Sequence, residues 1–226
     1  MSVGQEILFP TPLAVFLQLR ELVITWEFWG AVGFSLLRIT LGFLSGVAAG
    51  VLLAVPAYRY VRFREFLSPF VMTIKTIPVA SFIIVVLIWV PSRNLSVLIS
   101  FLMVFPILYT GVLEGIRNTD RALLEMATVF EIPVARRVRY IYVSEVLPFF
   151  RAACTVALGL CWKVGIAAEV IGLPSGSVGE NIYNAKIYLD TPNLFAWTVV
   201  IIALSILFEK LFLRLIRSLV RRLERG

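Results

Sequence analysis

Five stretches of the sequence are nearly free of charged residues and long enough to cross a lipid bilayer as helices. A helical span needs about 20 predominantly apolar residues. Within a few residues at each end, the stretches are Gly33–Ala57, Phe70–Val90, Leu95–Ile116, Ala152–Leu173 and Phe195–Leu215. The pattern therefore predicts an all-α integral membrane protein with five transmembrane helices, built as one domain over residues 1–226.

The first stretch carries three glycines at four-residue spacing, Gly42, Gly46 and Gly50. Residues four apart lie on the same face of a helix, so the glycines form one stripe. Small residues in such a stripe let a second helix approach closely inside a membrane. We expect a helix–helix contact there, and the stripe says nothing about a substrate.

Composition supports a membrane location and removes some chemistry. Hydrophobic residues make up 60% of the 226 residues, and the mean hydropathy is +0.93, whereas soluble domains are about 45–50% apolar. The chain has no histidine, the commonest residue of metal sites and acid–base catalysis. Cys154 and Cys161 are about 10 Å apart along a helix axis, which is too far for a disulfide, so we expect two small core residues.

The net charge of +7 comes from basic residues that gather in three segments. If the spans alternate in direction, all three segments lie on one side of the membrane. They contain 15 of the 21 lysines and arginines: Arg59, Arg62, Arg64, Arg117, Arg121, Arg136, Arg137, Arg139, Arg151, Lys210, Arg214, Arg217, Arg221, Arg222 and Arg225. The positive-inside rule places this side in the cytoplasm. The charge is thereby explained without nucleic acid as a partner, and residues 216–226 are predicted to be a basic cytoplasmic tail.

The same topology places residues 1–28 outside the cytoplasm. Pro10, Pro12 and several charged residues make this segment too polar and too broken to cross the membrane. It has neither the basic n-region nor the apolar h-region of a signal peptide. Near the outer span ends lie aromatic residues typical of an interfacial belt, namely Trp26, Trp29, Tyr183, Tyr188 and Trp197.

Residues 117–151 form a long loop on the basic side with a helical pattern of its own. Leu123, Leu124, Ala127 and Phe130 recur at helical spacing, and a second helix is predicted from Pro133 to Leu147-Pro148. Proline is well tolerated at the first position of a helix. The loop is thus predicted to be two short helices joined at a bend, and a loop of this length in a compact protein is usually functional.

This loop resembles the coupling loop of binding-protein-dependent ABC permeases. The resemblance rests on Glu125-Met126-Ala127, Glu131, Ile141, Ser144 and Leu147-Pro148, against a family pattern of Glu-Ala-Ala, three residues, Gly, nine residues, Ile, one residue and Leu-Pro. In the family this helix–turn–helix docks into a groove on a cytoplasmic ATPase and passes its closure to the spans. The resemblance implies a set of ATPase-coupling residues: Asp120, Leu124, Glu125, Ala127, Glu131, Pro133 and Ile141.

The rest of the chain is similar to the nitrate/sulfonate/taurine-type branch of these permeases. The matching motifs are Ser35-Leu36-Leu37-Arg38 followed by Gly42, Lys75-Thr76-Ile77-Pro78, Ala167-Ala168-Glu169 and Gly176-Ser177-Val178-Gly179. The resemblance implies a type I ABC importer permease, multi-pass in the bacterial inner membrane, carrying a nitrate-, sulfonate- or taurine-like anion or a small metabolite such as a vitamin precursor. It also implies four partners: an ATPase subunit, an extracytoplasmic substrate-binding protein, a second permease copy (as a homodimer) and membrane lipid.

The sequence departs from the family pattern in three places. The glycine of the bend is Glu131 here, which is costly if the position has positive φ, so we expect the bend to differ and to be set by Pro133. The proline of the final Leu-Pro falls on Ser144. The branch usually has one more N-terminal span, and two expectations stay open: a sequence that starts late through a misassigned start codon, or a five-span variant.

Three charged residues fall within the spans, Lys75, Lys163 and Glu169. Charges inside the membrane are costly and point to function. At about 100° per residue, Lys163 and Glu169 point about 120° apart, so we do not expect them to pair directly. Each either lines the translocation pathway or pairs with another helix or the second copy. With Pro78, these residues are the candidates for the pathway; Lys75 is expected to serve a gate or fold that the family shares, and Arg38 to reach the outer membrane surface.

Residues 172–184 form a loop rich in Gly, Ser and Pro on the outer side. In the family such loops face the extracytoplasmic binding protein. The plain alternative is a solvated turn.

The chain contains no Gly-x-x-x-x-Gly-Lys-[Ser/Thr] phosphate loop, so we expect it to bind no cofactor itself and a separate subunit to use ATP and Mg²⁺. Two other functions make different predictions for the sequence. An ion-coupled secondary carrier or channel predicts internal repeats with broken half-helices, and we find no convincing repeat. A membrane-embedded enzyme predicts clustered acids within the spans, where Glu169 stands essentially alone.

Overall fold

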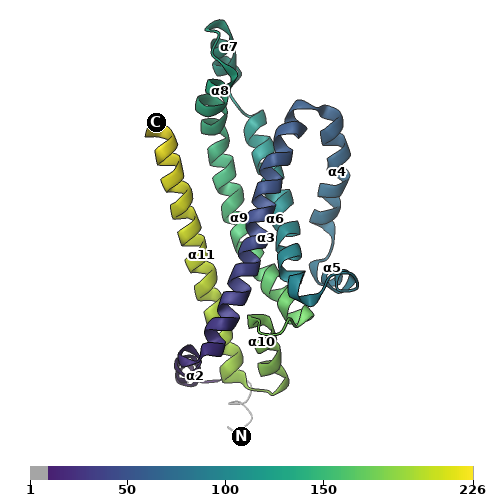
Figure 1. The fold of residues 1–226 in the computed structure, drawn as a ribbon, viewed down its shortest axis with the longest axis vertical. Helices are drawn as coiled ribbons and strands as arrows, with labels where there is room; N and C mark the ends of the chain where they lie inside the picture. Colours follow the sequence, from purple (N-terminus) through teal and green to yellow (C-terminus); the bar gives the residue numbers. More distant parts are fainter. Residues whose placement is uncertain (1–9, 226) are drawn as a thin grey trace.

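The computed structural model describes the backbone of residues 10–225 and the side chains of residues 10–218. Every element in that part of the chain is helical (Figure 1). In chain order the helices are α2 (Pro12–Ile24), α3 (Trp26–Arg59), α4 (Val61–Thr76), α5 (Val79–Val86), α6 (Ser92–Arg117), α7 (Arg121–Val129), α8 (Val134–Arg137), the π-helical turn η1 (Val138–Tyr142), α9 (Val143–Gly172), α10 (Val178–Ile187) and α11 (Thr191–Arg225).

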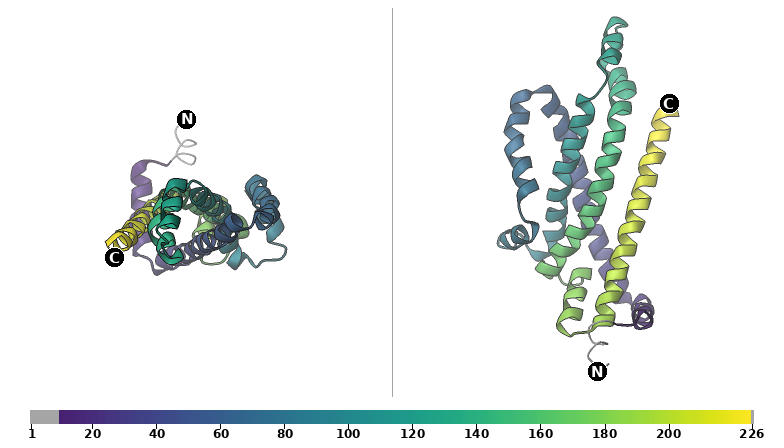
Figure 2. Two further views of the ribbon diagram at one scale, coloured as in Figure 1. Left: turned by 90° about the horizontal axis from the view of Figure 1, so that it is seen from above. Right: turned by 180° about the vertical axis from the view of Figure 1, so that it is seen from behind.

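Helices α3, α6 and α9 form the centre of the bundle, with α4 on one side and α11 on the other (Figures 1 and 2). The largest core cluster joins α3, α6, α9 and α11 through side chains that include Phe43, Leu108, Trp162 and Trp197. Phe43 of α3 meets Phe212 of α11 edge-on, with ring centroids 4.8 Å apart. Apolar side chains of helices distant in the sequence therefore hold the bundle together.

The glycine stripe of α3 lies directly against α6. A Cβ atom at Gly42 would lie 2.6 Å from Ser100 Cβ, and one at Gly46 would lie 2.8 Å from Val104 Cβ. Gly50 repeats the relationship with Leu108 one turn further on. Only glycine allows the two backbones to approach this closely.

The predicted span Phe70–Val90 is wrong as one straight helix. The chain bends by 105° between α4 and α5, at Ile77 and Pro78. Ile77 is extended, with φ −65° and ψ 130°, because a residue before proline is disfavoured in the α region. The bend thus turns α5 away from the direction of α4, at the side of the bundle (Figure 1).

Three helices in the described part are long and apolar enough to cross a membrane, α3, α6 and the continuous helix Val134–Gly172. The bent pair α4 and α5 is a fourth candidate when it is counted as one span. The fifth predicted stretch lies within α11, a 35-residue helix whose last side chains lie outside the described residues.

The boundary predicted at Leu147-Pro148 is also wrong. Helix runs without a break from Val134 through η1 into α9, and Pro148 lies inside it. Proline within a membrane helix is tolerated where neighbouring groups satisfy the freed carbonyl. The loop and the following span are consequently one element.

The two ends of the bundle differ as the charge pattern predicts. The α3–α4 turn, α7 and the end of α11 lie at one end, and α2 and α10 lie at the other (Figures 1 and 2). The predicted outer segment 1–28 includes α2, which lies across that end, while residues 1–9 lie outside the described residues, as do the side chains of Arg221, Arg222 and Arg225.

One member of the predicted aromatic belt is a core residue instead. Trp197 is 2% exposed and stacks on Phe28 with ring centroids 5.2 Å apart. Trp26, by contrast, is 88% exposed. Both tryptophans lie near a span end in the sequence, so this criterion alone does not show which of them is buried.

Candidate functional site

The loop at the basic end folds as a helix, a tight turn and a second helix. Asp120 caps α7, with its carboxylate accepting a hydrogen bond from the Ala122 amide at 2.8 Å. At the other end of α7 the amide of Glu131 donates to Thr128 O at 3.1 Å, and the amide of Ile132 donates to Ala127 O at 2.9 Å. This is a Schellman motif, in which the residue after the C-cap takes the left-handed conformation.

Glu131 occupies that left-handed position, with φ 51°. Our expectation that the bend would differ was therefore wrong: the glutamate adopts the conformation that the family's glycine favours. A side chain in this conformation costs about 1–2 kcal/mol relative to ordinary helix. Pro133 comes next as the N-cap of α8, so proline follows the bend and does not set it.

Arg137 fastens the bend from the second helix, a contact that the sequence reasoning missed. Its Nε donates to the Ile132 carbonyl at 2.7 Å, and its Nη1 donates to the Thr128 hydroxyl at 3.2 Å. The only signal in the sequence is a basic residue one turn after Pro133. In the sequence it contributes only to the charge that predicts the orientation in the membrane. The guanidinium joins α7, the turn and α8 into one body.

The candidate coupling residues divide into a buried and an exposed group. Ala127 is fully buried and Ile141 is 8% exposed, whereas Glu125 is exposed. Leu124 is half-buried, and Asp120, Glu131 and Pro133 are exposed.

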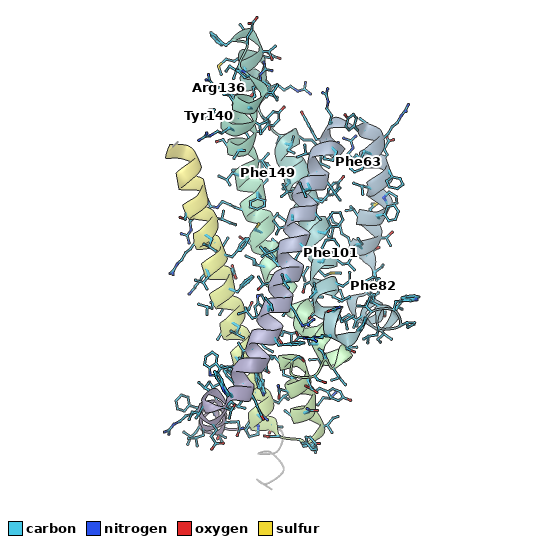
Figure 3. The ribbon with its side chains drawn as sticks, in the orientation of Figure 1. Phe63, Phe82, Phe101, Arg136, Tyr140 and Phe149 are labelled. Carbon is cyan, nitrogen blue, oxygen red and sulfur yellow. The ribbon has the colours of Figure 1, made fainter. Side chains whose placement is uncertain are left out.

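Four exposed apolar side chains that are not among the predicted coupling residues lie on α7 and at the start of α8, and we call them the apolar tip: Met126, Val129, Phe130 and Val134. Val129 is 79% and Phe130 is 72% exposed. Helix α7 projects beyond the other helices of the bundle (Figure 1), and Arg136 and Tyr140 lie just below it on α8 and η1 (Figure 3). A projecting surface of large apolar residues is typical of a protein contact.

Lys163 and Glu169 lie on different faces of α9. Lys163 is exposed within the apolar stretch of α9, whereas Glu169 is fully buried. Thr155 and Gly159 share the open side of α9 with Lys163, and a Cβ at Gly159 would meet no atom within 4 Å. This side of α9, which also carries exposed Val156 and Leu160, is therefore open in the described part of the isolated subunit.

Lys75 lines a cleft of about 360 Å³ between α4 and α6. Its Nζ lies 3.5 Å from the Thr110 hydroxyl, and Arg64 and Arg117 line the same cleft. Pro78 lies beyond, at the bend before α5. Lys163 is not among the residues that line this cleft.

Glu169 lies where α3, α9 and α10 meet. Its Oε2 accepts a hydrogen bond from the Ser35 hydroxyl at 2.6 Å and one from the Gly179 amide at 3.4 Å. Of the two expectations for Glu169, lining a pathway or pairing between helices, these contacts favour the second. The same contacts join two motifs that the sequence reasoning noted separately, at Ser35 and Gly179.

Arg38, expected to reach the outer membrane surface, donates from Nη1 to Asn94 Oδ1 at 3.2 Å. Its guanidinium also lies 4.2 Å from the centre of the Phe34 ring. The two free cysteines are buried. Within residues 10–225, no group of three or more His, Cys, Asp or Glu residues is arranged to hold a metal ion.

Comparison with known proteins gives one consistent family. Residues 46–225 match the family described as "Binding-protein-dependent transport system inner membrane component". A putative aliphatic sulfonates transport permease of Bacillus subtilis (strain 168) is 28% identical over 227 residues, covering 100% of this chain and 79% of the relative. A probable ABC transporter permease of Brucella abortus (strain 2308) is 26% identical over 97% of this chain and 88% of its own length. The taurine transport system permease of Escherichia coli (strain K12) is 24% identical over 80% of this chain and 66% of its own length.

Proposed function

The chain belongs to the family of binding-protein-dependent transport system inner membrane components, and from this premise we propose that it carries a small organic anion of the sulfonate class. The family is the membrane translocation subunit of ABC transporters, so the chain is a multi-pass permease of the bacterial inner membrane and not an enzyme. The alternative of an ion-coupled carrier or channel is therefore wrong. The observation that carries the assignment is the family match over residues 46–225.

The substrate class rests on the relatives and on the charge of the spans. Two of the relatives are named for aliphatic sulfonates and for taurine. Lys163 is an exposed cation on α9, and intramembrane cations are retained where a function needs them. A sulfonate group is a permanent anion, which this cation complements. Nitrate or a small metabolite remains the alternative class.

The α7–turn–α8 element is proposed as the docking site of a separate ATPase subunit. Its apolar tip offers contact area, and the Schellman turn and Arg137 make it one rigid body. Ala127 and Ile141, both buried, support the element from inside, while Glu125 faces the partner. ATP and Mg²⁺ act in the partner, because this chain has no phosphate loop.

The pathway is proposed to form between two copies of the chain. The spans of one subunit are too few to enclose a path, and the side of α9 that carries Lys163 is open in the described part of the isolated subunit. A second copy would cover that side and place Lys163 beside the substrate, with Pro78 giving α4 and α5 a point at which to move. Rocking of the two halves about a central site then gives alternating access.

The extracytoplasmic binding protein is proposed to dock at the end that carries α10. Helix α10 belongs to the outer loop region that faces binding proteins in the family, and Tyr188 just after it is 81% exposed. Lipid surrounds the remaining apolar faces of the bundle.

ATP-driven uptake into proteoliposomes tests this function. We would reconstitute the permease with a candidate ATPase and a candidate binding protein of the same organism and measure entry of radiolabelled taurine and a linear alkanesulfonate. Uptake that requires ATP is expected, with a loss of at least tenfold for Lys163→Gln and none for Lys210→Gln, an exposed lysine of α11. Uptake of neither sulfonate by an assembly that hydrolyses ATP would contradict the substrate class.

A further inference from the structure

The carboxylate of Glu169 is the centre of a buried polar junction between three helices. It accepts hydrogen bonds from Ser35 of α3 at 2.6 Å and from the Gly179 amide of α10 at 3.4 Å. Ser35 in turn accepts a hydrogen bond from the Val178 amide at 3.0 Å. Ser35, Glu169 and Val178 are all fully buried, so these bonds do not compete with water.

The junction holds the first turn of α10. Val178 and Gly179 are its first two residues, and the first amides of a helix have no partner within the helix. A negative charge is also favourable at this end of a helix dipole. Glu169 and Ser35 thus satisfy the two amides that α10 would otherwise leave buried and unpaired.

Helices α9 and α10 are in close contact at the junction. A Cβ added at Gly179 would overlap the Cβ of Glu169, so the start of α10 rests directly on α9. Ser177 caps α10 with a hydrogen bond from the Glu180 amide at 3.0 Å. The position of α10 is therefore fixed relative to α9.

The same helix reaches the opposite end of the bundle. Residues Val134–Gly172 are one continuous 39-residue helix, which is about 58 Å long at 1.5 Å per residue. Its cytoplasmic start is α8, which Arg137 fastens to α7. Glu169 lies one turn from its outer end. This one continuous helix thus joins the α7–turn–α8 element to α10.

We propose that Glu169 is a positioning residue that couples α10 to the ATPase-docking element through α9, so that binding-protein docking raises ATP turnover. The proposal rests on the proposed function, since it takes α10 as part of the outer docking surface. Glu169 acts through Ser35, Val178 and Gly179 and does not touch the substrate.

The test compares Ser35→Ala with Ser45→Ala. Ser35 serves the junction, whereas Ser45 lies on the same helix and donates only to the carbonyl of Gly42 in its own turn, at 2.9 Å. In nanodiscs we would measure hydrogen exchange of residues 174–187 and the stimulation of ATP turnover by liganded binding protein. For Ser35→Ala we expect at least tenfold faster exchange at the Val178 and Gly179 amides and a fivefold or greater fall in stimulation, with basal turnover within twofold. Ser45→Ala should match the wild type.

Glu169→Gln provides a second variant of nearly the same size. An amide oxygen is a weaker acceptor than a carboxylate, so both readouts should shift in the same direction by about two- to fivefold. Faster exchange with unchanged stimulation in Ser35→Ala would reduce the junction to a purely structural contact and overturn the proposal. Unchanged exchange in both variants would overturn it as well.

The two readouts also separate this proposal from the proposed function. Hydrogen exchange needs neither the ATPase nor the binding protein. A wild-type permease that the binding protein never stimulates would contradict the proposed function and the coupling role, while the exchange rates would still show whether Glu169 anchors α10.

Discussion

Arg137 Nη1, on α8, lies 3.2 Å from the Thr128 hydroxyl, on α7, and donates a hydrogen bond to it. The same guanidinium donates from Nε to the carbonyl of Ile132 in the turn between the two helices. One side chain thereby spans both arms of the proposed ATPase-docking element. Force applied to α7 can then pass to α8, and from α8 into the long helix of which it is the start.

Removing this guanidinium should loosen the element without unfolding the bundle. We expect Arg137→Ala to destabilise α7 locally by about 1–3 kcal/mol, because hydrogen bonds from a charged group are lost. The measure is hydrogen exchange of residues 121–132, which should be faster. Arg136→Ala is the matched control, since Arg136 is exposed on the same helix. Equal exchange in the two variants would show that Arg137 does not hold the turn.

Replacing the strained residue of the turn should stabilise it. Glu131 has φ 51°, which glycine adopts without the steric cost of a side chain. We expect Glu131→Gly to stabilise the turn by about 1 kcal/mol and to slow exchange at the Ile132 amide, with ATPase binding retained. Faster exchange at this amide would contradict the left-handed turn.

The contact between α3 and α6 predicts different effects for two glycines of one helix. A Cβ at Gly46 would lie 2.8 Å from Val104 Cβ, whereas one at Gly33 would meet nothing within 4 Å. Gly46→Ala should destabilise the bundle by about 1–3 kcal/mol through overpacking. Gly33→Ala should be neutral or slightly stabilising, because alanine has the higher helix propensity.

Thermal melting of the purified protein in detergent compares these two variants directly. A lower midpoint is expected for Gly46→Ala alone. Equal midpoints would show that the glycine stripe does not pack against α6.

Much of the fold could be predicted from local patterns. The four-residue spacing of Gly42, Gly46 and Gly50 marks a close helix contact whatever the partner, and the structure supplies the partner, α6. The basic segments predicted which loops share one end of the bundle. Both signals work because they depend on periodicity and charge along a single segment.

The wrong predictions concern bends in helices and the burial of single side chains, which the hydrophobic periodicity does not indicate. An apolar stretch has the same hydrophobic pattern whether the helix is straight or bent. The chain bends at Pro78 within Phe70–Val90, whereas α9 continues through Pro148. A proline in the sequence therefore does not by itself show whether the helix bends or continues. Trp197 was misplaced for a similar reason, because only its partner Phe28 shows that it is buried.

The candidate site was predicted least well where it depends on distant pairs. Ser35 and Glu169 are 134 residues apart, and a single sequence contains no signal that pairs them. The motifs around both residues were recognisable, but their contact was not. Arg137 was missed because nothing in a run of basic residues distinguishes the one that folds back on a turn.

Retention of the ATPase by the apolar tip tests the central claim most directly. The variant is the double substitution Val129→Asp and Phe130→Asp, which places two charges on exposed side chains and leaves buried Ala127 in place. Tyr60→Asp is the matched control, since Tyr60 is 63% exposed at the same end of the bundle but outside the element. The measurement is the amount of ATPase that co-purifies with the permease in nanodiscs. We predict that the wild type and Tyr60→Asp retain the ATPase and that the double variant retains less than a tenth as much; equal retention by all three would contradict the claim that α7 and α8 are the docking element.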